Sequence, residues 1–169
     1  GGLWENMYKH KWNANDIYLY NVWKYLYKVI VLSNQSLSVI DRHKHLLSTK
    51  QIIEYKAEVR AIRALFYYYA MDMFGRIPIV TSYDVKPDQV IQSERSDVFK
   101  FIVDELQYVA PKLADTHSNK EGDYYGRITR PVVNFLLAKL ALNAEIYADD
   151  DWTDNQKQDG KNIFFTVNG

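Results

Sequence analysis

Two residues near the amino terminus have the side chains that a carbohydrate site needs. Trp12 and Asn15 stand three positions apart, and Trp4 lies eight residues before Trp12. A sugar ring has an apolar C–H face and a rim of hydroxyl groups, so its site combines an aromatic platform with planar amides that donate and accept hydrogen bonds. A tryptophan at this position is equally typical of a hydrophobic staple at a helix entry. Trp12, Asn15 and Trp4 are our candidate ligand-binding residues, with the staple open as the alternative.

The other polar residues do not form a recognised catalytic pattern. Glu54 and Glu58 stand one helical turn apart, whereas the two carboxyl groups of a glycosidase flank the scissile bond from opposite sides. His43 and His45 have no third ligand nearby in the sequence and are expected in a solvated turn. The chain also lacks a nucleophile elbow, a zinc-protease motif, a phosphate-binding glycine loop and any cysteine. We expect a protein that is not an enzyme.

A group of aspartates near the carboxyl terminus offers hard oxygen ligands for a cation. Carboxylates of this kind suit Ca²⁺, but the segment has neither the glycine at position six nor the glutamate at position twelve of an EF-hand loop. A solvated acidic loop is therefore the preferred interpretation, and we predict no cofactor, with calcium kept as the alternative. The group consists of Asp149, Asp150, Asp151, Asp154 and Asp159.

Composition excludes some partners and favours others. Lys and Arg number 21, as do Asp and Glu, so the formal net charge is zero and no basic stripe favours nucleic acid. No apolar run has the length of a membrane span, and the first residues do not form a signal peptide. The 14 Tyr, 7 Phe and 4 Trp are more amphipathic rings than a helical core needs. We therefore expect some of the aromatic side chains to lie at a surface or groove. The length fits a single domain, residues 1–169.

Two long amphipathic segments are predicted to form a helical hairpin that follows Trp12. The first covers about residues 16–41, with Asp16 or the preceding asparagine as its N-cap, and the second covers about 50–74. A short turn between two helices of similar length places them antiparallel. Gly75 ends the second helix, because glycine adopts the positive φ that a helix end favours.

A second hairpin is predicted in the rest of the chain. One helix covers about 94–114 and ends near Val109 or kinks there, because Pro111 removes a backbone donor. The next covers about 129–148 with a proline in its permissive first turn. Residues 163–167 are rich in aromatic and β-branched side chains and predict a short strand before an Asn-Gly turn, with the return strand beyond the end of the sequence.

Each hairpin is expected to be held together by small residues. Alanines recur at helical spacing along one face of the second helix and of the fourth, which would let a neighbouring backbone approach closely. We expect Ala61 and Ala141 to be buried between paired helices. The two stripes consist of Ala57, Ala61 and Ala64 and of Ala138, Ala141, Ala144 and Ala148.

Three segments of the chain resemble signature helices of the SusD/RagB family, in the order and spacing of that family. They are WKYLYKVIVLSNQSLSVI from Trp23, AEVRAIRALFYYYAMDMFGRIPIV from Ala57 and GRITRPVVNFLLAKLALNAEIYA from Gly126. The resemblance implies an all-α fold of TPR-like helical hairpins (an α-α superhelix) with long loops, here with a short carboxyl-terminal strand. Family members are several times longer, so the chain is expected to be a fragment.

The resemblance also implies a function. Members of this family are surface lipoproteins of the bacterial outer membrane that bind glycans or peptides without cleaving them. They deliver the ligand to a TonB-dependent transporter of the SusC type, and some carry calcium. The lipidated cysteine and signal peptide would lie upstream of this sequence. In starch-binding members a Trp and an Asn before the first helix contribute to an aromatic arc, which Trp12 and Asn15 match, so starch or another α-glucan is the expected ligand.

Two other functions remain open at this stage. A TPR-like scaffold would bind a peptide or protein in a groove between hairpins and would have no affinity for polysaccharide. An α-helical glycosidase would need catalytic carboxylates outside these 169 residues.

Overall fold

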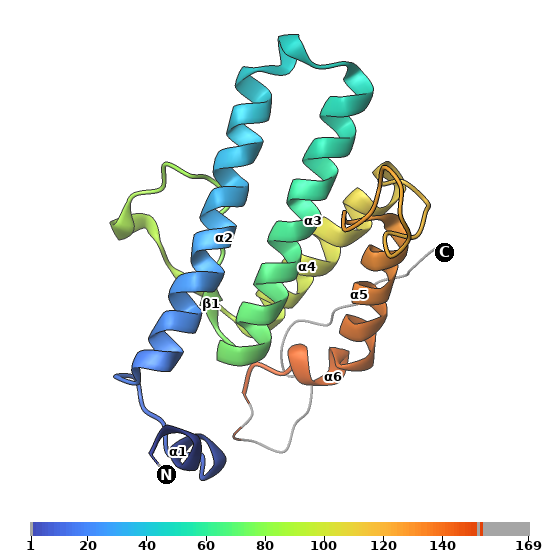
Figure 1. Ribbon diagram of the computed structural model, residues 1–169. Helices are drawn as coiled ribbons and strands as arrows, with labels where there is room; N and C mark the ends of the chain where they lie inside the picture. Colours follow the sequence, from blue (N-terminus) through green and yellow to red (C-terminus); the bar gives the residue numbers. More distant parts are fainter. Residues whose placement is uncertain (1, 152, 154–169) are drawn as a thin grey trace.

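The computed structural model describes residues 2–151 and residue 153, and these form an almost entirely helical structure (Figure 1). No helix in this described part is long and apolar enough to cross a membrane. The α-helices are α1 (Leu3–Tyr8), α2 (Ile17–Arg42), α3 (Thr49–Phe74), α4 (Arg95–Val109), α5 (Arg130–Leu142) and α6 (Ala144–Tyr147). Three 3₁₀ turns, η1 (Lys44–Leu46), η2 (Pro87–Gln89) and η3 (Ala110–Lys112), and two strands, β1 (Ile77–Pro78) and β2 (Gln92–Ser93), complete the described elements.

The antiparallel hairpin of α2 and α3 is the longest feature of the molecule (Figure 1), and the prediction of both helices is confirmed. The Asp16 carboxylate accepts hydrogen bonds from the first turn of α2, including one of 2.9 Å from the Tyr18 amide. Ser48 and Gln51 form a capping box at the start of α3. At the other end of α3, Gly75 has a φ of 69°, a backbone conformation that residues with a Cβ rarely adopt.

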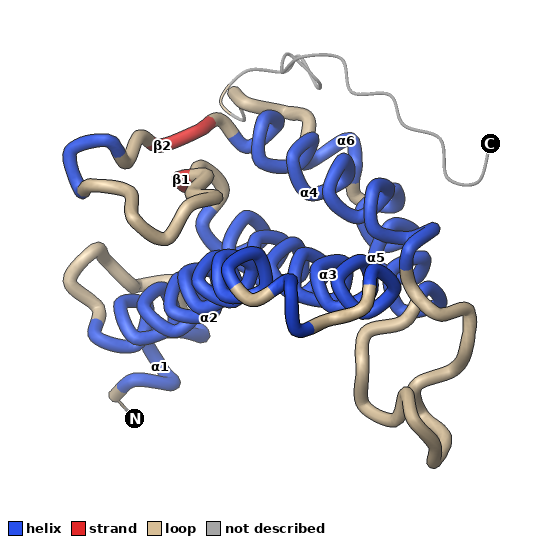
Figure 2. Tube along the Cα trace, turned by 90° about the horizontal axis from the view of Figure 1, so that it is seen from above, coloured by secondary structure: helices blue, strands red, loops and turns tan. Residues whose placement is uncertain are grey.

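The remaining helices form a second group beside α3. Seen from above (Figure 2), α2 and α3 lie next to one another, and α4, α5 and α6 lie together on the side of α3 away from α2. Helix α3 therefore packs against α2 on one side and α4 on the other. Of the two outcomes predicted for this helix α4, an end near Val109 is the one observed, and Pro111 lies in the following 3₁₀ turn.

The alanine stripe of α3 is buried as predicted. Ala61 and Ala64 are fully buried, and Ala57 is 1% exposed. Ile30 of α2 and Phe99 of α4 are also fully buried in the same cluster, on the two sides of α3. Since an alanine side chain ends at its Cβ atom, these positions let α2 and α4 approach the α3 backbone.

The alanine stripe predicted for the fourth helix is wrong at Ala138 and Ala141, whereas Ala144 is half-buried and Ala148 is buried. Ala138 and Ala141 are exposed, and Asn143 divides the predicted helix 129–148 into α5 and α6. A Leu or Val side chain removes several times more apolar surface from water than alanine does, so the larger residues determine which face of α5 turns inward. The buried residues of α5 are Val133, Leu136, Leu137 and Leu140.

The segment between α3 and α4 turns back beside α2. Strands β1 and β2 pair antiparallel at its base, with Ile77 opposite Ser93 and Pro78 opposite Gln92. This long loop agrees with the prediction of helical hairpins joined by extended connections. The strand predicted at residues 163–167 lies outside the described residues.

Candidate functional site

An aromatic groove lies where the chain enters α2, and we call it the Trp12 groove. Its volume is about 410 Å³. It combines ring faces from the entry segment, from the first turns of α2 and from the last residue of α3, and none of its lining residues is charged. The groove is lined by Trp12, Asn13, Ala14, Leu19, Tyr20, Trp23 and Phe74.

Trp23 has a fixed orientation at the inner wall of this groove. Its ring centroid lies 4.5 Å from that of Tyr27, one turn further along α2. On its other side the ring meets Phe74 edge-on, at 5.1 Å and an interplanar angle of 89°. Edge-to-face pairs of this kind favour one relative orientation of the two rings. The inner wall of the groove is therefore set by the packing of the α2–α3 hairpin.

Trp12 is placed by a turn rather than by the core. The Asn13 side chain accepts a hydrogen bond of 2.9 Å from the Asn15 amide, and the Asp16 amide donates to the Asn13 carbonyl at 3.0 Å. These bonds close the turn that precedes the N-cap of α2. Trp12 keeps 45% of its surface exposed and lies 5.0 Å from the ring of His10. It forms the outer, more accessible wall of the groove.

A second groove continues from the first along α2, and Trp23 lines both. This loop groove has a volume of about 480 Å³ and lies between α2 and the segment after β1. Most of its lining side chains are apolar. They are Trp23, Tyr27, Val31, Pro78, Val80, Ser82, Tyr83, Val85, Pro87 and Val90.

Buried hydroxyl and amide groups hold the wall of the loop groove in place. Tyr27 donates a hydrogen bond of 2.7 Å to the Pro78 carbonyl, and burial raises the pKa of its hydroxyl. The Tyr67 hydroxyl donates to the Val80 carbonyl at 2.8 Å and accepts from the Val80 amide at 2.7 Å. Burial raises the pKa of Tyr67 to about 12. Asn34, which is 2% exposed, donates to the same carbonyl at 2.8 Å.

An ionic cluster lies further along the hairpin, between α3 and α4. Arg63 is 4% exposed and donates to Glu105 at 2.7 Å and to the Asn34 side-chain oxygen at 2.8 Å. Arg60 donates to the same carboxylate through two of its nitrogens. Burial works against the charge of Glu105, but the hydrogen bonds from both arginines outweigh it and lower the pKa of that carboxyl. Arg60 and Arg63 therefore act within the fold, and Asn34 belongs to the same network.

The structure places the three candidate ligand residues differently. Trp12 lines the Trp12 groove. Asn15 is exposed in the turn beside it and is not a lining residue, and Trp4 is 79% exposed on α1. Trp23 and Phe74 also line this groove, and the only sequence signal for that role is that both are aromatic residues near the ends of the paired helices.

Glu54, Glu58 and His43 each have a polar neighbour within the fold. Glu58 accepts a hydrogen bond of 3.2 Å from the Nε atom of Arg127, and Glu54 lies 3.9 Å from Lys50. His43 is exposed, and its Nδ1 atom lies 3.0 Å from the Val39 carbonyl oxygen.

Two of the aspartates near the carboxyl terminus contact the start of α4. The Asp150 carboxylate accepts hydrogen bonds from the Ser96 amide at 2.8 Å and the Ser96 hydroxyl at 2.6 Å. The Arg95 guanidinium donates to the Asp149 carbonyl. A guanidinium beside these oxygens disfavours a divalent cation, and no metal-binding group of three or more His, Cys, Asp or Glu occurs within residues 2–151 and 153. Asp154 and Asp159 lie outside the described residues.

Comparison with known proteins gives one consistent result. A family model for SusD-like proteins, described as "Starch-binding associating with outer membrane", matches residues 2–142. The starch-binding protein SusD of Bacteroides thetaiotaomicron is 27% identical over 101 residues, which cover 60% of this chain and 17% of that protein. A SusD-like protein of Bacteroides ovatus is 26% identical over 136 residues, covering 76% of this chain and 23% of that protein.

Solved structures agree with the sequence matches. A laminarin-binding SusD-like protein superposes with a TM-score of 0.66 and 26% identity, covering 74% of this chain and 26% of that one. The predicted all-α, TPR-like fold is therefore confirmed. The chain spans only 17% to 26% of the length of these three relatives.

Proposed function

Because this chain belongs to the SusD-like family, we propose that the protein binds a glycan without cleaving it and that the Trp12 groove is part of the binding surface. The family match supports glycan binding in general. The observation that carries the site assignment is the uncharged groove in which Trp12, Tyr20 and Trp23 present rings around about 410 Å³ of space. Ring faces of this kind pack against the apolar faces of sugar residues.

Within this proposal Trp12 is the residue that stacks on the sugar, and Asn15 and Trp4 are outer contacts. Trp12 is half-exposed at the mouth of the groove, whereas Trp23 is held by Tyr27 and Phe74. The exposed ring can meet a sugar, while the inner ring supplies a rigid wall. Asn15 lies in the turn beside Trp12, where its amide can reach the hydroxyl rim of a sugar that extends beyond the groove.

We propose a glucan as the ligand, with an α-glucan such as starch preferred over a β-glucan. SusD of Bacteroides thetaiotaomicron is a starch-binding protein, and one of the solved relatives is a laminarin-binding protein. The preference for the α-linkage follows the resemblance of Trp12 and Asn15 to the Trp and Asn that precede the first helix in starch-binding members of the family. The family description also favours the outer membrane as the location. By the same family argument, the ligand would be delivered to a SusC-type TonB-dependent transporter, with the protein held at the cell surface by a lipid anchor.

Calorimetric titration of the full-length protein with maltoheptaose tests this assignment. Trp12→Ala removes the accessible ring and should weaken binding roughly tenfold or more, since truncating a central aromatic anchor costs about 2 kcal/mol. Trp12→Phe keeps a ring and should lose less. Tyr125→Ala, which removes an exposed ring in the loop before α5, should bind as the wild type does.

Laminariheptaose in place of maltoheptaose separates the two glucans. Binding of only the β-glucan would reject starch and keep the groove. Absence of binding to both sugars would reject a glucan ligand, and undiminished binding by Trp12→Ala would remove Trp12 from the site.

A further inference from the structure

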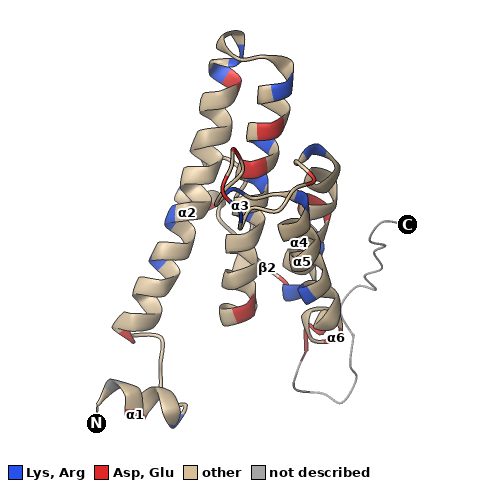
Figure 3. Ribbon diagram, turned by 45° about the vertical axis from the view of Figure 1, so that its right-hand side comes forward, with Lys and Arg blue, Asp and Glu red and all other residues tan. Residues whose placement is uncertain are grey.

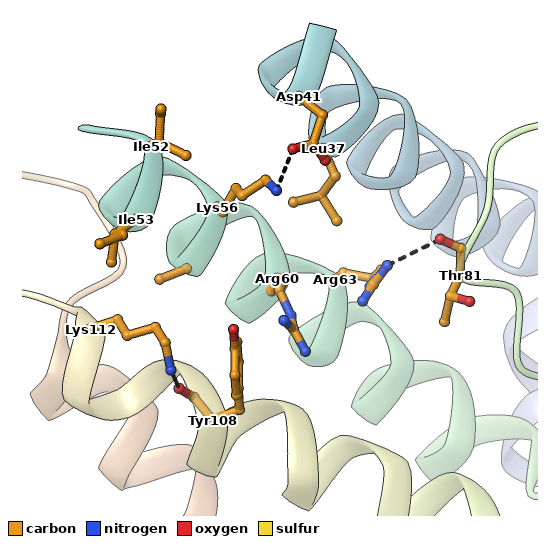
Figure 4. Close-up of a pocket in the computed structure, with 11 residues that line it drawn as sticks. Leu37, Asp41, Ile52, Ile53, Lys56, Arg60, Arg63, Thr81, Tyr108 and Lys112 are labelled. Carbon is orange, nitrogen blue, oxygen red and sulfur yellow. Dashed lines mark hydrogen bonds and ion pairs between the residues drawn. The ribbon is translucent and has the colours of Figure 1, made fainter. Parts of the chain in front are cut away.

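A third cavity lies at the opposite end of the α2–α3 hairpin, and it differs in chemistry from both aromatic grooves. We call it the cationic pocket. It has a volume of about 320 Å³ and lies between the last turns of α2, the first turns of α3 and the end of α4 (Figure 4). Ala57 of the pocket and Phe74 of the Trp12 groove are roughly 25 Å apart along α3, at 1.5 Å per residue.

Positive charge exceeds negative charge around this cavity. Four cationic side chains line it, whereas Asp41 is its only carboxylate. Glu105 lies behind the two arginines and adds a second negative charge. Two positive charges therefore remain in a chain whose overall net charge is zero. The cations are Lys56, Arg60, Arg63 and Lys112.

Two of these cations, Lys56 and Lys112, retain unused hydrogen-bond donors. Lys56 donates to Asp41 at 2.5 Å, and Lys112 donates to the Tyr108 backbone carbonyl at 2.5 Å. Arg60 uses Nε and Nη2 on Glu105, and its guanidinium also interacts with the Tyr108 side chain. Among the described residues Lys112 has no carboxylate partner. Each lysine ammonium has three donors, so the pocket can donate several more hydrogen bonds to an anion.

Tyr108 holds two of these cations in place at the pocket wall. Figure 4 shows its ring edge-on, with Lys112 on one side and Arg60 on the other. The Lys112 ammonium lies 3.4 Å from the ring centroid, and the Arg60 guanidinium carbon lies 4.0 Å from it. Attraction between a cation and a ring face restrains both side chains before any ligand arrives.

The rest of the lining is suited to an organic body rather than to a bare inorganic ion. Leu37, Ile52 and Ile53 present aliphatic groups, and Figure 4 shows the two isoleucines at one side of the cavity, away from Arg63 and Thr81. Asp41 and the exposed Thr81 supply acceptors for hydroxyl groups. A ligand that fits has one anionic group, several hydroxyls and an apolar face, which is the chemistry of a sugar acid.

We propose that the cationic pocket is a second carbohydrate site, one that takes a carboxylate-bearing sugar such as a hexuronate residue. Its carboxylate pairs with Lys112, and its C–H face packs on Ile52 and Ile53. The inference rests on the proposed glycan-binding function. It extends the range of ligands to acidic glycans, which the uncharged Trp12 groove has no cation to recognise.

Ligand-observed NMR on the full-length protein, at constant ionic strength, tests the proposal with glucuronate against glucose. Glucuronate should give saturation transfer and glucose should give none at the same concentration. Lys112→Gln removes one unpaired cation from the pocket mouth and should weaken glucuronate binding about tenfold, the effect of losing one charge-assisted hydrogen bond. Lys100→Gln, an exposed lysine on α4 paired with Asp104, should have no effect.

Several outcomes would overturn this inference. They are equal signals from glucose and glucuronate, unchanged binding by Lys112→Gln, or displacement of glucuronate by an equal concentration of sulfate, which would show an oxyanion site without sugar selectivity. Maltoheptaose binding, measured on the same samples, is independent of Lys112. Maltoheptaose binding without glucuronate binding rejects the cationic pocket alone. Absence of binding to both maltoheptaose and laminariheptaose rejects the proposed glucan-binding function.

Discussion

The two halves of α3 show how one helix can support two different kinds of surface. Between residues 50 and 63 the helix carries six charged side chains, and between residues 64 and 71 it carries none. Figure 3 shows the charged positions of α3 gathered toward the η1 end of the hairpin, with an uncharged stretch beyond them. The charged half meets Glu105 and Arg127 from other elements, and the uncharged half packs its rings against α2 and α4.

This difference indicates that the two ends of the hairpin are stabilised and used differently. At the charged end, removal of one charged side chain leaves its oppositely charged partner buried and unpaired. At the aromatic end, the stabilisation energy is distributed over many ring contacts, and each contact contributes less than one buried ion pair does. We therefore expect single substitutions to reduce stability more at the charged end than at the aromatic end. Only substitutions at the aromatic end should affect the binding of a neutral ligand.

The largest effect is expected for Glu105→Ala. This change leaves Arg63, which is 4% exposed, without its carboxylate and should lower the free energy of unfolding by about 3–5 kcal/mol. Urea denaturation of the full-length protein measures it. The control is Asp104→Ala, which removes a neighbouring carboxylate from an exposed ion pair and should cost less than about 1 kcal/mol. Equal losses in both variants would show that the buried cluster does not stabilise the fold.

A smaller loss is expected where the helices approach most closely. Ala61→Leu forces a larger side chain into a fully buried position and should destabilise the protein by about 1–3 kcal/mol. Ala141→Leu, on the exposed face of α5, should change stability by no more than about 0.5 kcal/mol. Thermal unfolding of the two variants compares the stripes directly. A similar loss at Ala141 would mean that this face of α5 is covered in the full-length protein.

The alanine stripes also show what the sequence could and could not predict. Apolar spacing identified α2 and α3, because long periodic segments with caps specify helices locally, and Pro111 identified the end of α4. Spacing could not decide which face of α5 turns inward, since Ala138 and Ala141 compete with leucines for the same core. The break at Asn143 had no strong signal in the sequence, and Asp150 contacts Ser96 from 54 positions away.

The candidate site was predicted only in part for the same reason. Trp12 could be selected because its side chain and its place before a helix are both visible in the sequence. Trp23 contributes to the same groove through packing on Phe74, which lies 51 positions away, and this contact depends on how α2 and α3 pair. The cationic pocket also depends on tertiary packing, because it brings Lys112 beside residues of α2 and α3.

At the aromatic end, Tyr67→Phe should cost about 1–2 kcal/mol. The Tyr67 hydroxyl is the hydrogen-bond acceptor for the Val80 amide, and its loss leaves a backbone donor without a partner beside the loop groove. Tyr69→Phe removes a hydroxyl from a ring that is 43% exposed and serves as the control, with no measurable change. Urea denaturation gives both values. A cost at Tyr69 that matched the cost at Tyr67 would contradict the role of the Val80 contact.

The pH dependence of stability gives the smallest and most specific effect. The pKa of Glu105 is lower in the folded protein than its usual value of about 4.5, so its contribution is fully present above that pH. It is lost as the pH falls through the folded pKa, because the protonated carboxyl no longer pairs with Arg60 and Arg63. Urea midpoints between pH 7 and pH 3 should fall more steeply for the wild type than for Glu105→Gln. Parallel curves would contradict this assignment.

A crossed titration tests the division of the hairpin most directly. The affinity of the full-length protein for maltoheptaose is measured calorimetrically in Trp12→Ala and in Lys112→Gln, at opposite ends of the hairpin. We expect Trp12→Ala to lose roughly tenfold or more in affinity and Lys112→Gln to bind as the wild type does. The reverse pattern, or an equal loss in both variants, would contradict the claim that the uncharged aromatic end holds the neutral glycan.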